Sequence, residues 1–163
     1  LYPVFGPEFD VPAPDVNTNG QIMGWMLNEY QKITGNKSKA TFTGKSLDNG
    51  GSEGREEATG YGGVYVFEEV VSKKGVDLPA GSKIAIQGFD NVSTFFAKAA
   101  EKLGYKIVAL SDSKGGIYNP EGLDFEKVLA HKKATGALFG FEGSKNITNA
   151  ELFPRVEKIW REG

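Results

Sequence analysis

The stretches KIAIQGFDNVS (residues 83–93) and YKIVALSD (residues 105–112) decide the fold of this chain. Each opens with a short run of apolar and β-branched residues, which is typical of a buried strand. Between them, apolar residues recur every three or four positions until Gly104, which indicates an amphipathic helix. A strand, a helix and a second strand at this spacing predict a parallel pair joined by a right-handed crossover, and therefore an α/β fold.

The same stretches carry the residues of a possible nucleotide site. Gly88 directly follows the first expected strand, and Asp112 ends the second one 24 residues later. In a dinucleotide-binding unit, a glycine turn lets backbone N–H groups approach a pyrophosphate, and an acid at the second strand holds the ribose hydroxyls. Only the first glycine of the G-x-G-x-x-G pattern is present, however. The spacing leaves two interpretations open, a dinucleotide site or a purely structural strand–helix–strand unit.

Asp90 is the residue that weakens the nucleotide interpretation. It stands where the second glycine of the pattern would be, so its carboxylate would meet the pyrophosphate as a like charge. Alternatively, the Asp90 side chain caps its own helix and satisfies the N–H groups that a phosphate needs. Both alternatives predict poor dinucleotide binding.

The rest of the chain predicts further helices and short strands around this unit. We expect Pro-rich residues 1–16 to form an extended lead-in, residues 17–153 a partial Rossmann-like nucleotide-binding domain with the first helix flanking the sheet, and residues 154–163 a tail. Gly60, Gly62 and Gly63 inside an expected helix indicate close approach by either a neighbouring element or a ligand. The expected helices span 17–34, 56–74, 91–103, 123–133 and 147–159, and further short strands are expected at 40–42 and 136–141.

Composition excludes several classes of protein. With 163 residues, 39% hydrophobic and 25% charged, the chain is long and apolar enough for about one globular domain. Zero cysteines and one histidine exclude disulfides and thiolate or multi-histidine metal centres, so no metal site is expected. A net charge of −2 without a basic block gives no support for nucleic-acid binding. The sequence shows neither a long apolar run nor a signal peptide, so we expect a cytoplasmic protein without membrane association.

Five motifs, in this order, resemble the glutamate dehydrogenase family, which includes the Leu, Phe and Val dehydrogenases. They are PAPDVNTN (12–19), TGKSLDNGGSEGREEATGYG (43–62), IAIQGFDNV (84–92), SDSKGGIYNPEG (111–122) and GSKNITNAELF (143–153). The resemblance implies a fragment that spans the hinge and the first half of the nucleotide-binding domain. It also implies that the segment with the substrate-binding and catalytic lysines, and the second half of the nucleotide domain, lie outside this chain.

The resemblance assigns roles to three residues before the first expected strand of the nucleotide unit. Asp15 matches the catalytic acid of the family, although by itself it would also fit as a cap of the helix that follows. Arg55 and Thr59 match residues that line the cleft, with the threonine beside the nicotinamide carboxamide. Their alternative roles are a surface salt bridge for Arg55 and a hydrogen bond at a helix start for Thr59.

The resemblance also places the two ends of the cofactor. Gly88 and Asn91 match the turn that holds the pyrophosphate, and Asp112, Ser113 and Lys114 match the adenine-ribose end. An acid there favours the free 2′-hydroxyl of NAD, whereas Lys114 could meet the 2′-phosphate of NADP. Both cofactors therefore remain open.

The family implies an enzyme that oxidises L-glutamate to 2-oxoglutarate and ammonia with NAD or NADP, although Leu, Val or Phe are alternative substrates. A second hypothesis is a non-catalytic fragment or degenerate paralogue that keeps the fold and binds the cofactor weakly or not at all. Family members form homo-hexamers, but much of that interface belongs to the preceding segment. We therefore expect this chain alone to be inactive, and a monomer or small oligomer.

Overall fold

The computed structural model describes residues 2–73, 75–152 and 154, and it divides the chain into two compact units. The first unit comprises Leu1–Glu56 and the second comprises Glu57–Gly163. Each unit has a hydrophobic core of its own. Within the described ranges, no helix has the length and apolar character needed to cross a bilayer.

The first unit is built around helix α1 (Gly20–Thr34), which confirms the helix predicted in this region. Two short 3-10 helices, η1 (Tyr2–Val4) and η2 (Leu47–Asn49), accompany it. Asn19 caps α1 by accepting a hydrogen bond from the N–H of Ile22 at 3.1 Å. The buried face of α1 is covered within the same unit, because the Tyr30 ring packs edge-to-face on Phe42.

The strand predicted at 40–42 is wrong, because these residues lie in a bend and turn. Phe42 is only 2% exposed, yet it is buried by its ring contacts with Phe5 and Tyr30 and not by a sheet. The following residue, Thr43, donates its backbone N–H to the carbonyl of Pro12 at 2.9 Å. The apolar character of this segment therefore reflects a packed loop.

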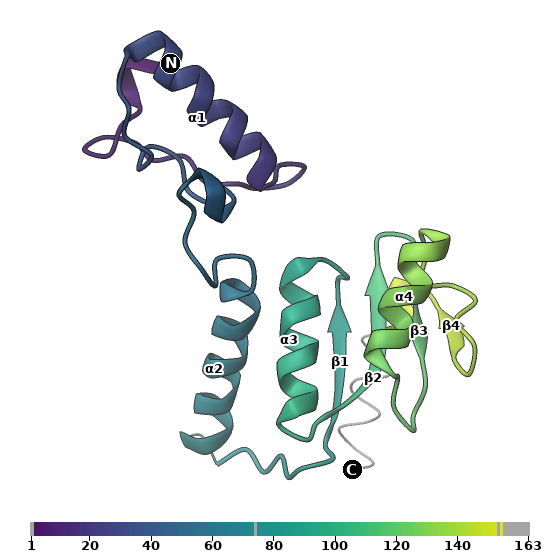
Figure 1. Cartoon of the computed structure of the whole chain (residues 1–163). Coiled ribbons are helices and arrows are strands. Elements are labelled where there is room, and N and C mark those ends of the chain that lie inside the picture. The colour runs from purple at the N-terminus through teal and green to yellow at the C-terminus, as the bar shows by residue number, and fades with distance from the viewer. Residues whose placement is uncertain (1, 74, 153, 155–163) are drawn as a thin grey trace. The chain divides into compact units, whose positions relative to one another are not determined.

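The second unit contains a four-stranded sheet in the order β1-β2-β3-β4. The strands β1 (Lys83–Gln87) and β2 (Lys106–Asp112) are parallel, as the sequence predicts, and helix α3 (Asn91–Lys102) connects them. The strands β3 (Gly115–Tyr118) and β4 (Lys145–Ile147) are antiparallel to their neighbours, so the sheet is mixed. The α/β fold class is confirmed (Figure 1).

The structure corrects two predictions in this sheet. No strand is predicted at residues 115–118, but they form β3, which pairs with β2 and places Gly116 opposite Ser111. The strand predicted at 136–141 is absent, and Leu138 is nevertheless buried in the core from a bend. Of the helix predicted at 147–159, Ile147 belongs to β4 and residues 149–152 are helical, whereas residues 153 and 155–159 lie outside the described residues, as does the predicted tail except for residue 154.

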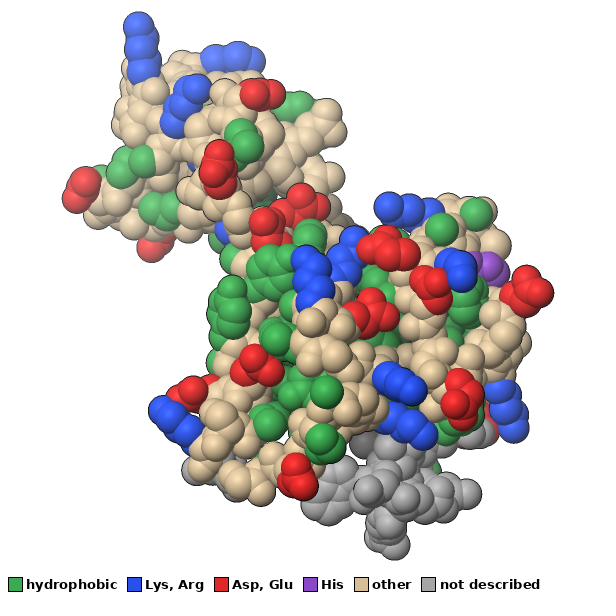
Figure 2. All heavy atoms as spheres, turned by 60° about the horizontal axis from the view of Figure 1, so that its bottom comes forward, with side chains coloured by type: hydrophobic (Ala, Val, Ile, Leu, Met, Phe, Trp, Pro, Cys, Tyr) green, Lys and Arg blue, Asp and Glu red, His purple; other side chains and the backbone are tan. Residues whose placement is uncertain are grey.

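Helix α2 (Ala58–Lys73) packs closely on α3, and Gly60 makes this possible. A Cβ atom at Gly60 would stand 2.5 Å from Cβ of Phe95 and 2.8 Å from the carbonyl oxygen of Val92. The close approach predicted at this glycine is therefore that of a neighbouring helix. On the opposite side of α2, Tyr65 and Val66 remain exposed, and apolar side chains are visible at the surface among mixed charges (Figure 2).

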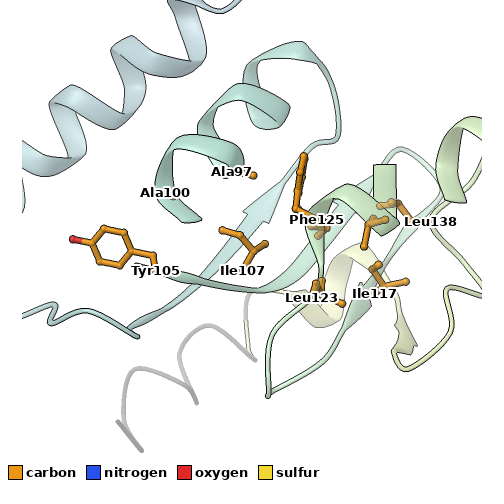
Figure 3. Close-up of a cluster of buried hydrophobic side chains, with 10 residues drawn as sticks. Ala97, Ala100, Tyr105, Ile107, Ile117, Leu123, Phe125 and Leu138 are labelled. Atoms are coloured by element: carbon orange, nitrogen blue, oxygen red, sulfur yellow. The ribbon is translucent and has the colours of Figure 1, made fainter. Parts of the chain in front are cut away.

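The main core of the second unit lies between the sheet, α3 and α4 (Phe125–Thr135). Ala97 and Ala100 from α3 allow this helix to lie close to the sheet, and Phe125 fills the space near the start of α4 (Figure 3). Lys98 of α3 also pairs with Glu126 of α4 at 3.0 Å. This ion pair joins α3 and α4 beside the sheet.

Candidate functional site

The candidate site lies at the carboxyl ends of β1 and β2. Because these strands are parallel, Gly88 after β1 and Asp112 at the end of β2 are at the same edge of the sheet. Lys132 of α4 bridges the two ends: its Nζ is 2.9 Å from Oδ2 of Asp112 and 3.5 Å from the carbonyl oxygen of Phe89. We call Gly88–Asn91, Asp112 and Lys132 the sheet-edge site.

Gly88 leaves the backbone open at the first end of this site. Its φ of +98° lies in the region that L side chains rarely adopt, so the turn requires glycine. No atom other than those of its chain neighbours lies within 4 Å of the position that a Cβ would occupy. A ligand could therefore approach this backbone closely, which is the property that a pyrophosphate needs from the turn after the first strand.

Asp90 caps helix α3. Its Oδ1 accepts the N–H of Ser93 at 3.0 Å, while the Ser93 hydroxyl accepts the N–H of Asp90 at 2.8 Å. The N–H groups of Asn91 and Val92 have no acceptor among the described residues, as expected for a first helical turn. The start of α3 thus keeps donors for an anion, but an exposed carboxylate stands beside them.

Asp112 is held by several donors at the other end. Its side chain is 10% exposed, and besides Lys132 it accepts the backbone N–H of Lys114 at 2.8 Å. Burial alone would raise the pKa of Asp112, but the hydrogen bonds from Lys132 and from the backbone of Lys114, with the Lys132 charge, together lower it. The carboxylate is therefore ionised and fixed in place, as a group that accepts ribose hydroxyls should be.

Ser113 and Lys114 form the turn between β2 and β3, and both are exposed. The Lys114 ammonium donates to the carbonyl of Gly136, at the end of α4, at 3.4 Å. Lys132, and not Lys114, therefore carries the positive charge that pairs with Asp112. The structure brings Ser113 and Lys114 to the expected end of the site, but their contacts with a cofactor stay predictions.

The other predicted site residues lie in α2 or in the first unit. Thr59 is exposed in the first turn of α2, whereas Asp15 and Arg55 belong to the first unit. Asp15 does not cap α1, since Asn19 does so; instead its Oδ1 accepts the N–H of Val16 at 2.7 Å. No ion pair of Arg55 and no hydrogen bond of the Thr59 side chain occurs within the described residues. The roles of all three in a cleft remain predictions.

Lys132 is the main residue of the site that sequence reasoning missed. Its Nζ also lies 4.7 Å from the centre of the Phe89 ring, which gives the ammonium a second favourable contact. A signal was present, because Lys132 follows the buried Phe125 and Val128 at positions i+7 and i+4 on the same helix face. A lysine on a buried face requires a partner, and Asp112 is that partner.

Two family models match the chain. The model described as Glutamate/Leucine/Phenylalanine/Valine dehydrogenase matches residues 50–161, and the model described as Glu/Leu/Phe/Val dehydrogenase, dimerisation domain, matches residues 1–32. The first match contains the whole sheet-edge site. The second falls within the first compact unit.

Individual relatives agree with these models. The chain is 45% identical to the NAD-specific glutamate dehydrogenase of Peptoniphilus asaccharolyticus over 98% of its own length and 39% of that enzyme. It is 44% identical to the glutamate dehydrogenase of Thermotoga maritima, covering 36% of it.

Among solved structures, the leucine-bound hetero-hexameric glutamate dehydrogenase of Thermus thermophilus matches 93% of this chain and 35% of its own, with a TM-score of 0.85 and 36% identity. The chain thus spans less than two fifths of the length of these relatives. The matched motifs, the fold and the sheet edge agree: the chain belongs to the Glu/Leu/Phe/Val dehydrogenase family.

Proposed function

We propose that this chain is the nucleotide-binding part of an enzyme that oxidises L-glutamate to 2-oxoglutarate and ammonia, with NAD or NADP as the hydride acceptor. The observation that carries the proposal is the open backbone at Gly88 on the same sheet edge as the ionised Asp112. The names of relatives from P. asaccharolyticus and Clostridioides difficile, both NAD-specific glutamate dehydrogenases, support glutamate as substrate and NAD as cofactor.

In this proposal, the sheet-edge site binds the cofactor along its length. The N–H groups of Asn91 and Val92 donate to the pyrophosphate, which approaches over Gly88. Asp112 accepts the hydroxyls of the adenine-ribose, and Ser113 and Lys114 border the same end. These contacts fit the geometry, because donors without acceptors in the described chain face one end and a fixed acceptor stands at the other.

The chemistry is assigned to residues nearer the nicotinamide. The bound cofactor would supply the hydride acceptor for the substrate Cα. Asp15, whose carboxylate is exposed, would act as a general acid and base when the imine is hydrolysed, the role that the family resemblance assigns to it. Thr59 would bond the carboxamide, and Arg55 would line the cleft.

A second candidate function is a non-catalytic member of the family, and the capping by Asp90 favours it. The Asp90 carboxylate accepts the N–H of Ser93 and leaves a negative charge beside the remaining donors of α3.

The oligomeric state is a separate question. The chain spans only part of the length of its relatives, so we do not carry over hexamer formation from them. We expect light scattering to show a monomer of 17.6 kDa or a small oligomer, and a hexamer mass would contradict this.

Two assays on the same preparation separate these functions. Calorimetric titration with NAD and NADP measures binding, and the absorbance of reduced nicotinamide with L-glutamate measures turnover. Binding of the cofactor, with or without turnover, supports the nucleotide-binding part of the enzyme, because this chain alone is expected to be inactive, and weak or absent binding supports the non-catalytic alternative. Absence of binding at millimolar cofactor would refute the proposed site.

A further inference from the structure

A ligand at the end of β2 would not meet Asp112 as an isolated negative charge, because both of its carboxylate oxygens already have partners. Lys132 lies 2.9 Å from Oδ2, and the backbone N–H of Lys114 occupies Oδ1. The side chains of Asp112 and Lys132 are 10% and 23% exposed, so water screens this pair less than a surface pair. The Asp112–Lys132 pair at the end of β2 therefore has nearly zero net charge.

The net charge of the Asp112–Lys132 pair bears on cofactor choice, because NAD and NADP differ only at the 2′ position of the adenine-ribose. A carboxylate at the end of the second strand accepts a free 2′-hydroxyl and repels a 2′-phosphate. A cation beside that carboxylate removes the repulsion and can itself attract the phosphate. The selectivity of such a site depends on the sum of the charges and not on the aspartate alone.

We infer that Lys132 is a specificity-determining residue, which by cancelling the charge of Asp112 weakens the discrimination of the sheet-edge site against a 2′-phosphate. The inference rests on the proposed function, since it assumes that adenine-ribose binds at this end. It assigns to Lys132 the part in cofactor choice that the sequence alone suggested for Lys114.

The surroundings of Lys132 hold its ammonium in this position. The Phe89 ring centre lies 4.7 Å from Nζ, and the Phe89 carbonyl oxygen lies 3.5 Å away. Lys114 instead reaches the carbonyl of Gly136, and Lys133 is exposed on the same helix. Of these three lysines, Lys132 alone lies on the Asp112 carboxylate, so only its removal should change the selectivity strongly.

The test uses two small probes that differ at the 2′ position, adenosine 5′-monophosphate and adenosine 2′,5′-bisphosphate. Their dissociation constants are measured by calorimetry at fixed ionic strength for the full chain and for Lys132→Met, Lys132→Gln and Lys133→Met. Lys132→Gln can keep a hydrogen bond to Asp112 without the charge, and Lys133→Met removes an equal charge one residue away. Circular dichroism verifies the fold of each variant.

We expect both Lys132 variants to raise the ratio of the bisphosphate constant to the monophosphate constant at least about tenfold, with Lys133→Met within about threefold of the wild type. As a converse, Asp112→Asn should lower the ratio, and it tests the charge balance even where a Lys132 variant does not fold. An unchanged ratio in the folded variants, or an equal shift in Lys133→Met, would overturn the role of Lys132 and leave the proposed function intact. If the wild type binds neither probe, the proposed function fails and this inference fails with it.

Discussion

Asp90 and Asp112 are the same residue type at the same edge of one sheet, but their surroundings differ. Asp90 is exposed, and its carboxylate accepts only a backbone N–H at the start of α3. Asp112 is mostly buried, and Lys132 cancels its charge. A phosphate would therefore be repelled at the first aspartate and tolerated at the second. Whether a carboxylate near a bound phosphate repels it therefore depends on the charges of the residues beside that carboxylate.

The largest difference between the two aspartates should be in stability. We expect Asp112→Asn to lower the free energy of unfolding by about 2 kcal/mol, because Lys132 would be left without its counter-charge. This is less than the loss of about 3–5 kcal/mol for a fully buried pair, since the Lys132 side chain keeps 23% of its exposure. Urea denaturation measures the change.

The matched control is Asp90→Asn, which replaces the same charge at a position where asparagine caps a helix equally well. Its effect on stability should be within about 0.5 kcal/mol. Equal losses in the two variants would mean that burial and pairing do not distinguish these aspartates.

The second prediction concerns affinity for the cofactor. Asp90→Asn and Asp90→Gly should each bind NAD about tenfold more tightly than the wild type, which corresponds to about 1.4 kcal/mol, because both remove the like charge beside the pyrophosphate. Calorimetry gives the constants. Improvement in Asp90→Gly alone would show that the cap or its bulk, and not the charge, obstructs the phosphate. No improvement in either would show that the Asp90 carboxylate points away from it.

The smallest expected effect is on pH dependence. The pKa of Asp112 in the folded chain lies below its ordinary value of 3.8. The stability that this group contributes is therefore fully present above pH 3.8, and it is lost as the pH falls through the lower folded pKa. Unfolding free energies of the wild type and of Asp112→Asn should differ by a constant amount at neutral pH and converge in acid. A gap that persists unchanged at pH 2 would contradict this.

Much of the sheet edge could be predicted from the sequence, because its elements follow local rules. The β-branched runs of β1 and β2 and the apolar spacing of α3 depend on residues close together in the chain. Asp90 as an N-cap is equally local, since its partner Ser93 is three positions away. The positions predicted for Gly88, directly after the first strand, and for Asp112, at the end of the second, are therefore confirmed.

The parts that sequence reasoning missed depend on distant partners. No strand is predicted at Gly115 and Gly116, but β3 forms there because β2 and β4 pair with it on both sides. Leu138 is buried without a strand because the core accepts a side chain from a bend. Lys132 and Asp112 are 20 residues apart, so no local pattern links them.

The most direct test of the sheet-edge site is an NMR titration of the full chain with NAD, read at each backbone amide. We expect saturable shifts that are largest at Gly88, Asn91, Val92 and Lys114, because these amides border the proposed pyrophosphate and ribose positions. The amide of Gly35, at the end of α1 in the first unit, serves as the internal reference. Shifts centred elsewhere, or none that saturate, would contradict a nucleotide site at the carboxyl ends of β1 and β2.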